Sequence, residues 1–385
     1  MRPPTLHLLR NEKTRVDNKA RGMHVPRLSS MQANNTNAPH SIIQSPSRNT
    51  ASFSTAVISA CLFLLISSCT SGRQPLVAIA ARDAQPKKTS LLLSIRSDLD
   101  LRNQTASERY FGPSPSFELR SPTDVAVDKR GSIYISDSGL GGIAASIAAK
   151  SNNRSAKYSF MLVKSDEFGR GRPEGMGYNA ELDWLAVADS YLKVVIIYEL
   201  PSMRRVGSIK SPEFMNPVDV AIDAINRRIY VADSVRDTVL AFDLEGNHIM
   251  DIGRPGRDKG GLFRPSSVAV DGSGLLYVVD SFNFRYQVFT PGGQPVFQSG
   301  ERGNGSGKFI KPHGIALDPA GKVLVSDYSS GEVQYFSGEG AAPTLALGGL
   351  KSPAGIYANG NGMMYVAEPE GHRVLVFRLG SQGQN

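Results

Sequence analysis

Cysteine, tryptophan and long apolar runs are scarce in this chain of 385 residues. Its two cysteines, Cys61 and Cys69, provide neither a disulfide framework nor a structural zinc site, which needs more ligands at regular spacing. The chain has one Trp but 38 Gly and 23 Pro, and its apolar residues fall in many short bursts separated by turn residues. This pattern is typical of short strands joined by turns, and it favours an all-β fold.

The main part of the chain also lacks an excess of either charge. The formal net charge is +8, but residues 1–50 hold eight Lys or Arg against two acids, which accounts for +6 of it. Residues 51–68 carry no charge, so the chain from Cys69 onward keeps only the remaining +2. A nearly balanced surface attracts phosphate backbones weakly, and we therefore expect no nucleic-acid binding by the main domain.

One apolar stretch stands apart from the rest, at residues 56–66 (AVISACLFLLI). It is too short to cross a bilayer as a helix of about 20 residues, and it is typical of the core of a signal peptide. The four residues that end at Cys69 (ISSC) resemble the lipobox of bacterial lipoproteins, which implies that Cys69 carries a lipid. An ordinary signal peptide or a short anchor that happens to end in cysteine remains the alternative.

The N-terminal region divides into three segments by composition. Residues 1–53 are polar and without periodicity, and we expect a disordered extension or a mis-assigned start. Residues 54–69 form the signal core and lipobox, and residues 70–88 form a small, polar, basic tether. These segments predict an exported protein, held to the membrane by a lipid anchor and facing the periplasm or the cell surface. The folded domain is expected at residues 89–380.

The decisive feature of the sequence is a unit that recurs six times. Each unit begins with a proline followed by a short β-rich burst, at spacings of 41 to 51 residues: Pro122, Pro173, Pro217, Pro265, Pro312 and Pro353. A second burst ends in an acid in every unit: Asp137, Asp189, Asp233, Asp280, Asp327 and Glu368. A third burst and a weaker fourth complete the unit. Four-stranded antiparallel sheets that cover one another around an axis account for this pattern, so we predict a six-bladed β-propeller.

The bursts of each unit resemble the NHL repeat, with P-x-G-I-A-V-D, then I-Y-V-A-D-S, then R-V-x-V-F, over about residues 121–378. The last unit stops after its third burst, at residues 374–377. An unpaired edge would then be left in the sixth blade. We expect residues 89–95 (TSLLLSI) to supply the missing strand.

The acids that end the second bursts have a structural interpretation. One acid per blade spreads around the ring, too far apart for a single ion whose ligands lie about 2 to 2.6 Å away. The NHL resemblance implies that a basic residue five positions later pairs with the acid. Asp280 with Arg285 and Glu368 with Arg373 retain this pattern, and we expect both to be structural acid–base pairs.

The position after each proline differs from unit to unit, where side chains reach the mouth of the central channel. The six residues are Thr123, Glu174, Val218, Ser266, His313 and Ala354. Recognition of an asymmetric partner requires such differences, so we predict a binding face that includes Thr123, Glu174, Ser266 and His313. We also expect residues 139–154 of the first unit to form an extra loop on that face.

A metal-dependent hydrolase or lyase with its site at the axial channel is the alternative function. Zinc-binding NHL-like lyases need several converging histidines, and from Cys69 onward the chain has only His248, His313 and His372. The acids and amide near the axis occupy non-equivalent positions and do not suggest a calcium cage: Asp124, Glu174, Asp219 and Asn216. We therefore expect no cofactor and no metal, and a monomer that binds a protein, peptide or glycan. A binding role is favoured over a catalytic one, which stays open.

Overall fold

The computed structural model describes residues 90–96, 118–149, 157–166, 169–337 and 343–379. Cys69 and the predicted segments 1–53, 54–69 and 70–88 lie outside the described residues, and so does Thr89. Within the described part of the chain, no helix is long and apolar enough to cross a membrane.

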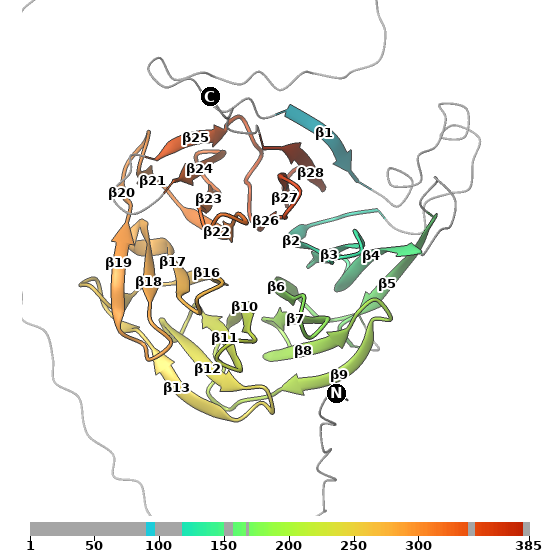
Figure 1. Cartoon of the computed structure of the whole chain (residues 1–385), viewed down its shortest axis with the longest axis horizontal. Coiled ribbons are helices and arrows are strands. Elements are labelled where there is room, and N and C mark those ends of the chain that lie inside the picture. The colour runs from blue at the N-terminus through green and yellow to red at the C-terminus, as the bar shows by residue number, and fades with distance from the viewer. Residues whose placement is uncertain (1–89, 97–117, 150–156, 167–168, 338–342, 380–385) are drawn as a thin grey trace, which may run out of the picture. The chain divides into compact units, whose positions relative to one another are not determined.

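Six four-stranded antiparallel sheets stand around a common axis, which confirms the predicted all-β propeller (Figure 1). The first strands lie nearest the axis: β2 (Pro122–Val127), β6 (Pro173–Asn179), β10 (Pro217–Asp223), β16 (Pro265–Val270), β22 (Pro312–Leu317) and β26 (Ile356–Ala358). The second strands pair with them: β3 (Ile133–Asp137), β7 (Trp184–Asp189), β11 (Arg228–Asp233), β17 (Leu276–Asp280), β23 (Val323–Asp327) and β27 (Met363–Glu368).

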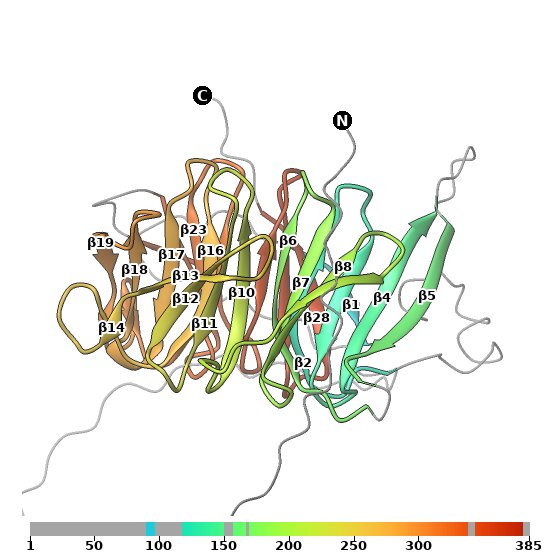
Figure 2. The same cartoon turned by 90° about the horizontal axis from the view of Figure 1, so that it is seen from below.

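The outer half of each blade holds the third and fourth strands. The third strands are β4 (Gly142–Ala149), β8 (Val194–Glu199), β12 (Thr238–Asp243), β18 (Arg285–Phe289), β24 (Glu332–Phe336) and β28 (Arg373–Arg378). The fourth strands are β5 (Lys157–Lys164), β9 (Arg204–Ile209), β13 (His248–Ile252), β19 (Pro295–Ser299), β25 (Thr344–Leu347) and, in blade 6, β1 (Ser90–Ile95). Figure 2 shows the strands running between the two faces of the ring.

Blade 6 is completed by the strand from the other end of the domain. Strand β1 pairs antiparallel with β28, from Ser90 opposite Arg378 to Ile95 opposite Val374. The side chain of Ile95 is fully buried in the cluster that joins blades 6 and 1. The prediction that residues 89–95 close the ring is therefore confirmed for the described residues Ser90–Ile95.

Apolar side chains from facing sheets fill the spaces between blades. The first strands use small and β-branched residues because strands crowd near the axis, and Val125, Ala126 and Val220 are almost completely buried. Large rings pack farther out, where the blades diverge, as Tyr230 and Phe289 do between blades 3 and 4. Burying a side chain of this size contributes roughly 1.5–3 kcal/mol relative to leaving it exposed. Each blade is therefore stabilised mainly by its two neighbours.

Two glycine-rich connections, at residues 253–264 and 300–311, lead into the first strands of blades 4 and 5. Each contains a short parallel bridge: β14 (Arg254–Pro255) with β15 (Gly261–Leu262), and β20 (Glu301–Arg302) with β21 (Lys308–Phe309). A buried glutamine from the third strand satisfies the backbone of each connection. Gln287 accepts a hydrogen bond from the Gly260 amide (2.9 Å), and Gln334 accepts one from the Gly307 amide (2.8 Å). The connections end just before Pro265 and Pro312, so they position the residues that precede those prolines.

The expectation of an extra binding loop at residues 139–154 is wrong for residues 139–149, and residues 150–154 lie outside the described residues. Residues Gly142–Ala149 form β4, the third strand of blade 1, and its Ile143, Ala144 and Ala145 are buried. Alanine and glycine have weak strand propensity, but small side chains suit a strand on which the neighbouring blade packs closely. Strand β4 begins beside Asp137 and ends beyond Ile133, so its end lies toward the face opposite the prolines that precede the first strands.

Candidate functional site

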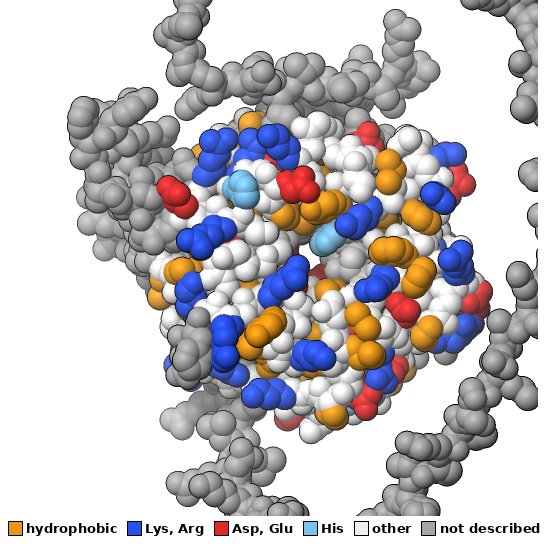
Figure 3. Space-filling model, turned by 180° about the vertical axis from the view of Figure 1, so that it is seen from behind, with side chains coloured by type: hydrophobic (Ala, Val, Ile, Leu, Met, Phe, Trp, Pro, Cys, Tyr) orange, Lys and Arg blue, Asp and Glu red, His pale blue; other side chains and the backbone are white. Residues whose placement is uncertain are grey.

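One face of the propeller carries the start of each first strand and the end of each second strand. Pro122 lies opposite Asp137, Pro217 opposite Asp233 and Pro265 opposite Asp280. We call this surface the proline face, and Figure 3 looks onto it. The loops that precede the prolines and the turns between second and third strands surround the axis here.

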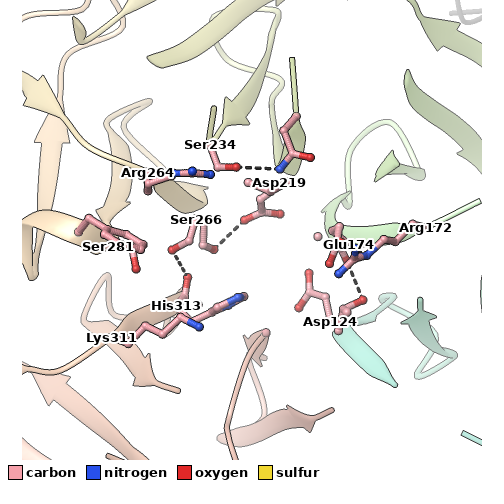
Figure 4. Close-up of a pocket in the computed structure, with 18 residues that line it drawn as sticks. Asp124, Arg172, Glu174, Asp219, Ser234, Arg264, Ser266, Ser281, Lys311 and His313 are labelled. Carbon is pink, nitrogen blue, oxygen red and sulfur yellow. Dashed lines mark hydrogen bonds and ion pairs between the residues drawn. The ribbon is translucent and has the colours of Figure 1, made fainter. Parts of the chain in front are cut away.

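A pocket of about 300 Å³ opens on the proline face at the axis. Its lining residues come from all six blades, from Thr123 in blade 1 to Gly355 in blade 6. Figure 3 shows basic and apolar side chains around a hollow near the centre of this face, and Figure 4 shows the lining residues pointing inward.

All four predicted binding-face residues line this one pocket: Thr123, Glu174, Ser266 and His313. Val218 also lines it, whereas blade 6 contributes Gly355 and not Ala354. Two of the four also join blades. The Thr123 hydroxyl lies 3.0 Å from the backbone oxygen of Pro173, and the Ser266 hydroxyl donates to the backbone oxygen of His313 at 2.7 Å.

Two buried aspartates lie on one side of the pocket. Asp124 accepts hydrogen bonds from the amides of Val125 and Met176, both at 2.8 Å. Asp219 accepts them from the amide of Val268 (2.8 Å) and from the hydroxyl of Ser267 (2.6 Å). A carboxylate has about four acceptor sites, so both keep acceptor capacity toward the pocket.

Burial and proximity change the protonation of this pair. Burial raises the pKa of Asp124 well above its ordinary value, and the nearby charge of Asp219 raises it further. Burial also raises the pKa of Asp219, to about 7. Two carboxyl groups that interact this closely titrate as a pair, so the pair holds a proton near neutral pH.

The expectation that the acids near the axis occupy non-equivalent positions is wrong for Asp124 and Asp219, which both stand two residues after the proline, in blades 1 and 3. At this position Gly175 and Gly355 stand in the blades that precede Asp219 and Asp124 around the ring. A Cβ at Gly175 would collide with the Asp219 carboxylate, and one at Gly355 would collide with Asp124. Aspartate preceded by glycine in the previous repeat, at the same position, is the signal that would have found the pair.

Glu174 lies beside the aspartates and has its own cation. Arg172 approaches it with Nε 2.9 Å from Oε1, and the Ser190 hydroxyl donates to the same oxygen at 3.1 Å. Burial raises the pKa of Glu174, and the charge of Arg172 opposes that shift. This pairing partly neutralises the third acid of the pocket.

The opposite side of the pocket is basic and comes from blades 4 and 5. Lys311 holds its Nζ over the ring of Tyr328, 4.4 Å from the centroid, and the Tyr328 hydroxyl bonds Glu370 at 3.1 Å. Burial, with a smaller contribution from Lys311, lowers the pKa of His313 to about 4. The imidazole is therefore neutral at pH 7, and it adds a hydrogen-bonding group without charge.

Arg264 reaches the pocket from an unusual backbone conformation. Its φ of 55° lies in the left-handed region, which costs energy for a residue with a side chain. In blade 5 the equivalent amide, that of Lys311, bonds the acid of its own blade, Asp327. The Arg264 amide instead donates to Asp237 at 2.7 Å. The residue just before the proline is basic in blades 2, 4 and 5, and this repeated position is the sequence signal for the cations of the pocket.

The six acids that end the second strands form what we call the fastening ring. Asp327 is fully buried and accepts hydrogen bonds from the amides of Ile310 (2.6 Å) and Lys311 (3.0 Å), which precede the proline of its own blade. Asp137 binds the amides of Arg120 and Ser121 in the same way, at 2.7 and 3.0 Å. The acids thus hold the loops that surround the pocket.

Both predicted acid–base pairs belong to the fastening ring. Arg285 Nε lies 2.8 Å from Asp280 Oδ2, and both side chains are buried. Arg373 Nε bonds Glu368 Oε2, with the arginine side chain 17% exposed. Neither pair lines the axial pocket.

Among the described residues, no group of three or more His, Cys, Asp or Glu is arranged to hold a metal ion. His248 bonds Asp251 on the outer strand of blade 3, and His372 lies beside the backbone of Arg120. Neither histidine occupies the position of His313, which follows the proline of its repeat.

Fold and site together define a six-bladed β-propeller with a ligand-sized pocket at its axis. The family model described as "NHL repeat" matches residues 309–336, which cover the first three strands of blade 5. The chain is therefore a β-propeller that contains an NHL repeat in blade 5, and the match confirms the resemblance seen in the sequence for that unit.

Solved structures with the same architecture share little sequence with this chain. A protein of unknown function from Bacteroides thetaiotaomicron has a TM-score of 0.55 at 13% identity, over 68% of this chain and 70% of that one. Virginiamycin B lyase from Staphylococcus aureus has a TM-score of 0.51 at 11% identity, over 76% and 100%. A chain of a nidogen/laminin complex has a TM-score of 0.51 at 16% identity, over 64% and 89%. No curated protein sequence matches the chain. At these identities the similarity shows the fold alone.

Proposed function

We propose that this chain is an exported, lipid-anchored propeller that binds a protein or peptide partner on its proline face. The observation that carries this proposal is the coincidence of three features over blades 2 to 5: exposed apolar side chains, basic side chains and the axial pocket. Each feature alone is common on protein surfaces. Together they resemble a protein interface with a deep central pocket that is surrounded by apolar and charged side chains.

The exposed apolar side chains are concentrated on this face. Twelve large hydrophobic residues are exposed in the described part of the chain, and five of them lie on the proline face: Tyr191, Met215, Val235, Phe282 and Ile310. The rest lie on outer strands and on the opposite face. Aromatic residues, Met and Arg are enriched at the centres of protein interfaces, where they anchor the partner. Phe282 both lines the pocket and is 48% exposed, so it is the best candidate anchor.

The differences between blades also support recognition of an asymmetric partner. Blades 2 to 5 carry the five exposed apolar residues, together with Arg172, Arg264 and Lys311. The corresponding loops of blades 1 and 6 carry Arg120, Lys351 and His372 in place of apolar groups. A partner that covers blades 2 to 5 would bury apolar surface and meet an excess of positive charge, which favours an acidic protein or peptide.

One structural neighbour comes from a nidogen/laminin complex, and another is a lyase. The first is a precedent for a propeller that docks a protein, and the second for one that carries chemistry. A metal-dependent hydrolase or lyase is thus the second candidate, and the carboxyl groups of Asp124, Asp219 and Glu174 at the axis are the observation that favours it. Elemental analysis of the purified protein separates the two: one tightly held calcium or zinc per chain would favour the enzyme.

The export proposal depends on residues 56–66 and Cys69. Metabolic labelling with a fatty-acid analogue in a bacterial host tests it. We expect label on the unmodified chain and on Cys61→Ala, and none on Cys69→Ala. Secretion of an unlabelled chain would indicate an ordinary signal peptide instead.

The binding proposal is tested by cross-linking the partner in the native envelope, with matched surface variants. Phe282→Ser on the proline face should abolish the cross-linked product, because it removes the proposed anchor. Ile225→Ser is the control, since Ile225 is also exposed (59%) but lies in the turn between β10 and β11, on the opposite face. Loss of the product with the control variant, and not with Phe282→Ser, would assign the interface to the other face. A product that is a glycan would change the class of partner.

A further inference from the structure

The axial pocket has two chemically opposite sides. Its acidic side consists of Asp124, Asp219 and Glu174, from blades 1 to 3, and its basic side consists of Lys311 and Arg264, from blades 5 and 4. Figure 4 shows the two groups facing each other across the pocket. A simple anion or a simple cation would satisfy one side and leave the other side unmatched.

We propose that this pocket binds a small zwitterion, with its ammonium group against Asp124 and Asp219 and its carboxylate against Lys311 and Arg264. The ligand class is that of a free amino acid or a dipeptide, or the same pair of charges presented by a partner. This inference deepens the proposed function and uses the same pocket.

The acidic side is suited to an ammonium group. Both aspartates are almost fully buried, at 8% and 5% exposure, and each is held by backbone amides of its own and a neighbouring blade. Their orientation is therefore fixed before a ligand arrives, which lowers the entropic cost of binding. Two carboxyl groups near each other repel when both are charged, and an ammonium group that donates several hydrogen bonds relieves that repulsion.

The basic side is suited to a carboxylate. Tyr328 fixes Lys311 through a cation–π contact, and Arg264 is directed by its left-handed backbone. The neutral ring of His313 lies between these residues and the acids, 5.8 Å from the ring of Tyr328. Arg172 is engaged by Glu174, so the cations left to meet a ligand carboxylate are those of blades 4 and 5.

The size of the pocket limits the ligand. A volume of about 300 Å³ lies at the lower end of the range for small-molecule sites. It admits an amino acid or a dipeptide, and it excludes an oligosaccharide or a folded segment. A larger partner would therefore insert only the small part that carries both charges.

Calorimetric titration of the full-length chain in detergent tests the inference with three matched probes. These are alanyl-alanine, its N-acetyl derivative, which lacks the ammonium group, and its C-terminal amide, which lacks the carboxylate. We expect alanyl-alanine to bind at least about tenfold more tightly than either blocked form, because each loses one charged contact. Equal binding of the N-acetyl form, or binding of none of the three, would overturn the proposal.

Two variants assign the contacts. Lys311→Met should weaken alanyl-alanine about tenfold and leave the affinity of the C-terminal amide unchanged, since the amide has no carboxylate to lose. Lys351→Met is the control, because Lys351 is exposed on the same face and does not line the pocket. Asp219→Asn should weaken alanyl-alanine and leave the N-acetyl form unchanged; a variant that fails to fold leaves the probe series as the test.

Proton release gives an independent readout. The groups that face the ligand are Asp124, Asp219, Glu174, Arg172, His313, Lys311 and Arg264. An ammonium group binds the charged carboxylates, so binding should expel the proton held by the pair and weaken as the pH falls from 8 to 6. Titration in buffers of different ionisation enthalpy measures the protons released, and a value of zero at pH 6.5 would contradict the proposed contact.

Failure of this inference is distinguishable from failure of the proposed function. If no zwitterion binds but Phe282→Ser still abolishes the cross-linked partner, the proline face is an interface and the pocket has another ligand. If calcium or zinc alone binds tightly and blocks all three dipeptides, the acidic side is a metal site and the zwitterion is excluded.

Discussion

The fastening ring and the axial pocket lie on the same face and are built from equivalent positions of the same six repeats. In the fastening ring the chemistry is conserved from blade to blade, since every second strand ends in a buried acid. At the axial pocket, the residue two positions after the proline differs between blades. In ring order these residues are Asp124, Gly175, Asp219, Ser267, Gly314 and Gly355. The position that holds the backbone repeats in every blade, whereas the position that lines the axial pocket does not. This variation is what supports the proposed binding site on the proline face.

The largest expected effect comes from the fastening ring. Asp327→Ala leaves four backbone amides without their acceptor, those of Ile310, Lys311, Ser329 and Ser330. We expect a loss of about 4 kcal/mol in the free energy of unfolding, measured by urea denaturation. Asp243→Ala, at the half-buried end of β12 in blade 3, should lose about 1 kcal/mol. Equal losses of stability in the two variants would show that the acids of the fastening ring contribute no more than an acid outside it.

A pH dependence should distinguish the axial pair from the fastening ring. Asp219 has a pKa of about 7 in the folded chain, above the 3.8 of an unperturbed aspartate, so the folded state binds its proton more tightly. This contribution to stability is complete below pH 4 and is lost as the pH rises through 7. Asp219 alone should lower the free energy of unfolding by about 3 kcal/mol between pH 5 and 8, and Asp219→Asn should remove this part of the fall while the part due to Asp124 remains. If the free energy of unfolding fell as steeply with pH in Asp219→Asn as in the unmodified chain, Asp219 would not be protonated in the folded state.

The two acid–base pairs should differ in strength. Arg285 is buried and also bonds Gln298 and the backbone oxygens of Asp258 and Gly261, at 2.8–3.0 Å. We expect Arg285→Ala to lower the free energy of unfolding by about 3 kcal/mol, because a buried charge and several acceptors lose their partner. Arg373→Ala, at a more exposed pair, should lower it by about 1 kcal/mol. Thermal and chemical denaturation measure both, and the reverse order would contradict the burial argument.

The smallest effect on stability is expected inside the pocket. Glu174→Ala and His313→Ala remove side chains that differ from blade to blade, and each should change the free energy of unfolding by less than about 1 kcal/mol. Binding of the partner should nevertheless weaken about tenfold or more. Surface-plasmon titration beside a melting curve separates the two quantities. A large loss of stability with unchanged binding would assign these residues a structural role.

The fold was predictable because its signals repeat. The six prolines, the six acids and the missing fourth strand together predicted both the number of blades and the pairing of β1 with β28. Residues 142–149 were misread because one repeat of small residues resembles a loop when its neighbours in space are unknown. Burial between two blades, which selects small side chains there, is a tertiary property that local propensity does not contain.

The pocket was predictable in place but not in composition. The position after each proline predicted that Thr123, Glu174, Ser266 and His313 would meet, and all four line one cavity. Asp124 and Asp219 share a position in the repeat, but the approach of their carboxyl groups depends on how each side chain is oriented toward the next blade, which the sequence alone does not provide. The same holds for Arg264, whose direction follows from a left-handed backbone.

The closure of the ring by β1 and β28 has a consequence for the order in which the protein is made. A ribosome synthesises β1 first among the strands of the domain, and its partner β28 emerges roughly three hundred residues later. Until then the earliest strand has no hydrogen-bonding neighbour, and every blade formed in between belongs to an open arc. Only a finished chain can therefore become a ring, so a protein cut short during synthesis keeps two unpaired edges that proteases and chaperones recognise.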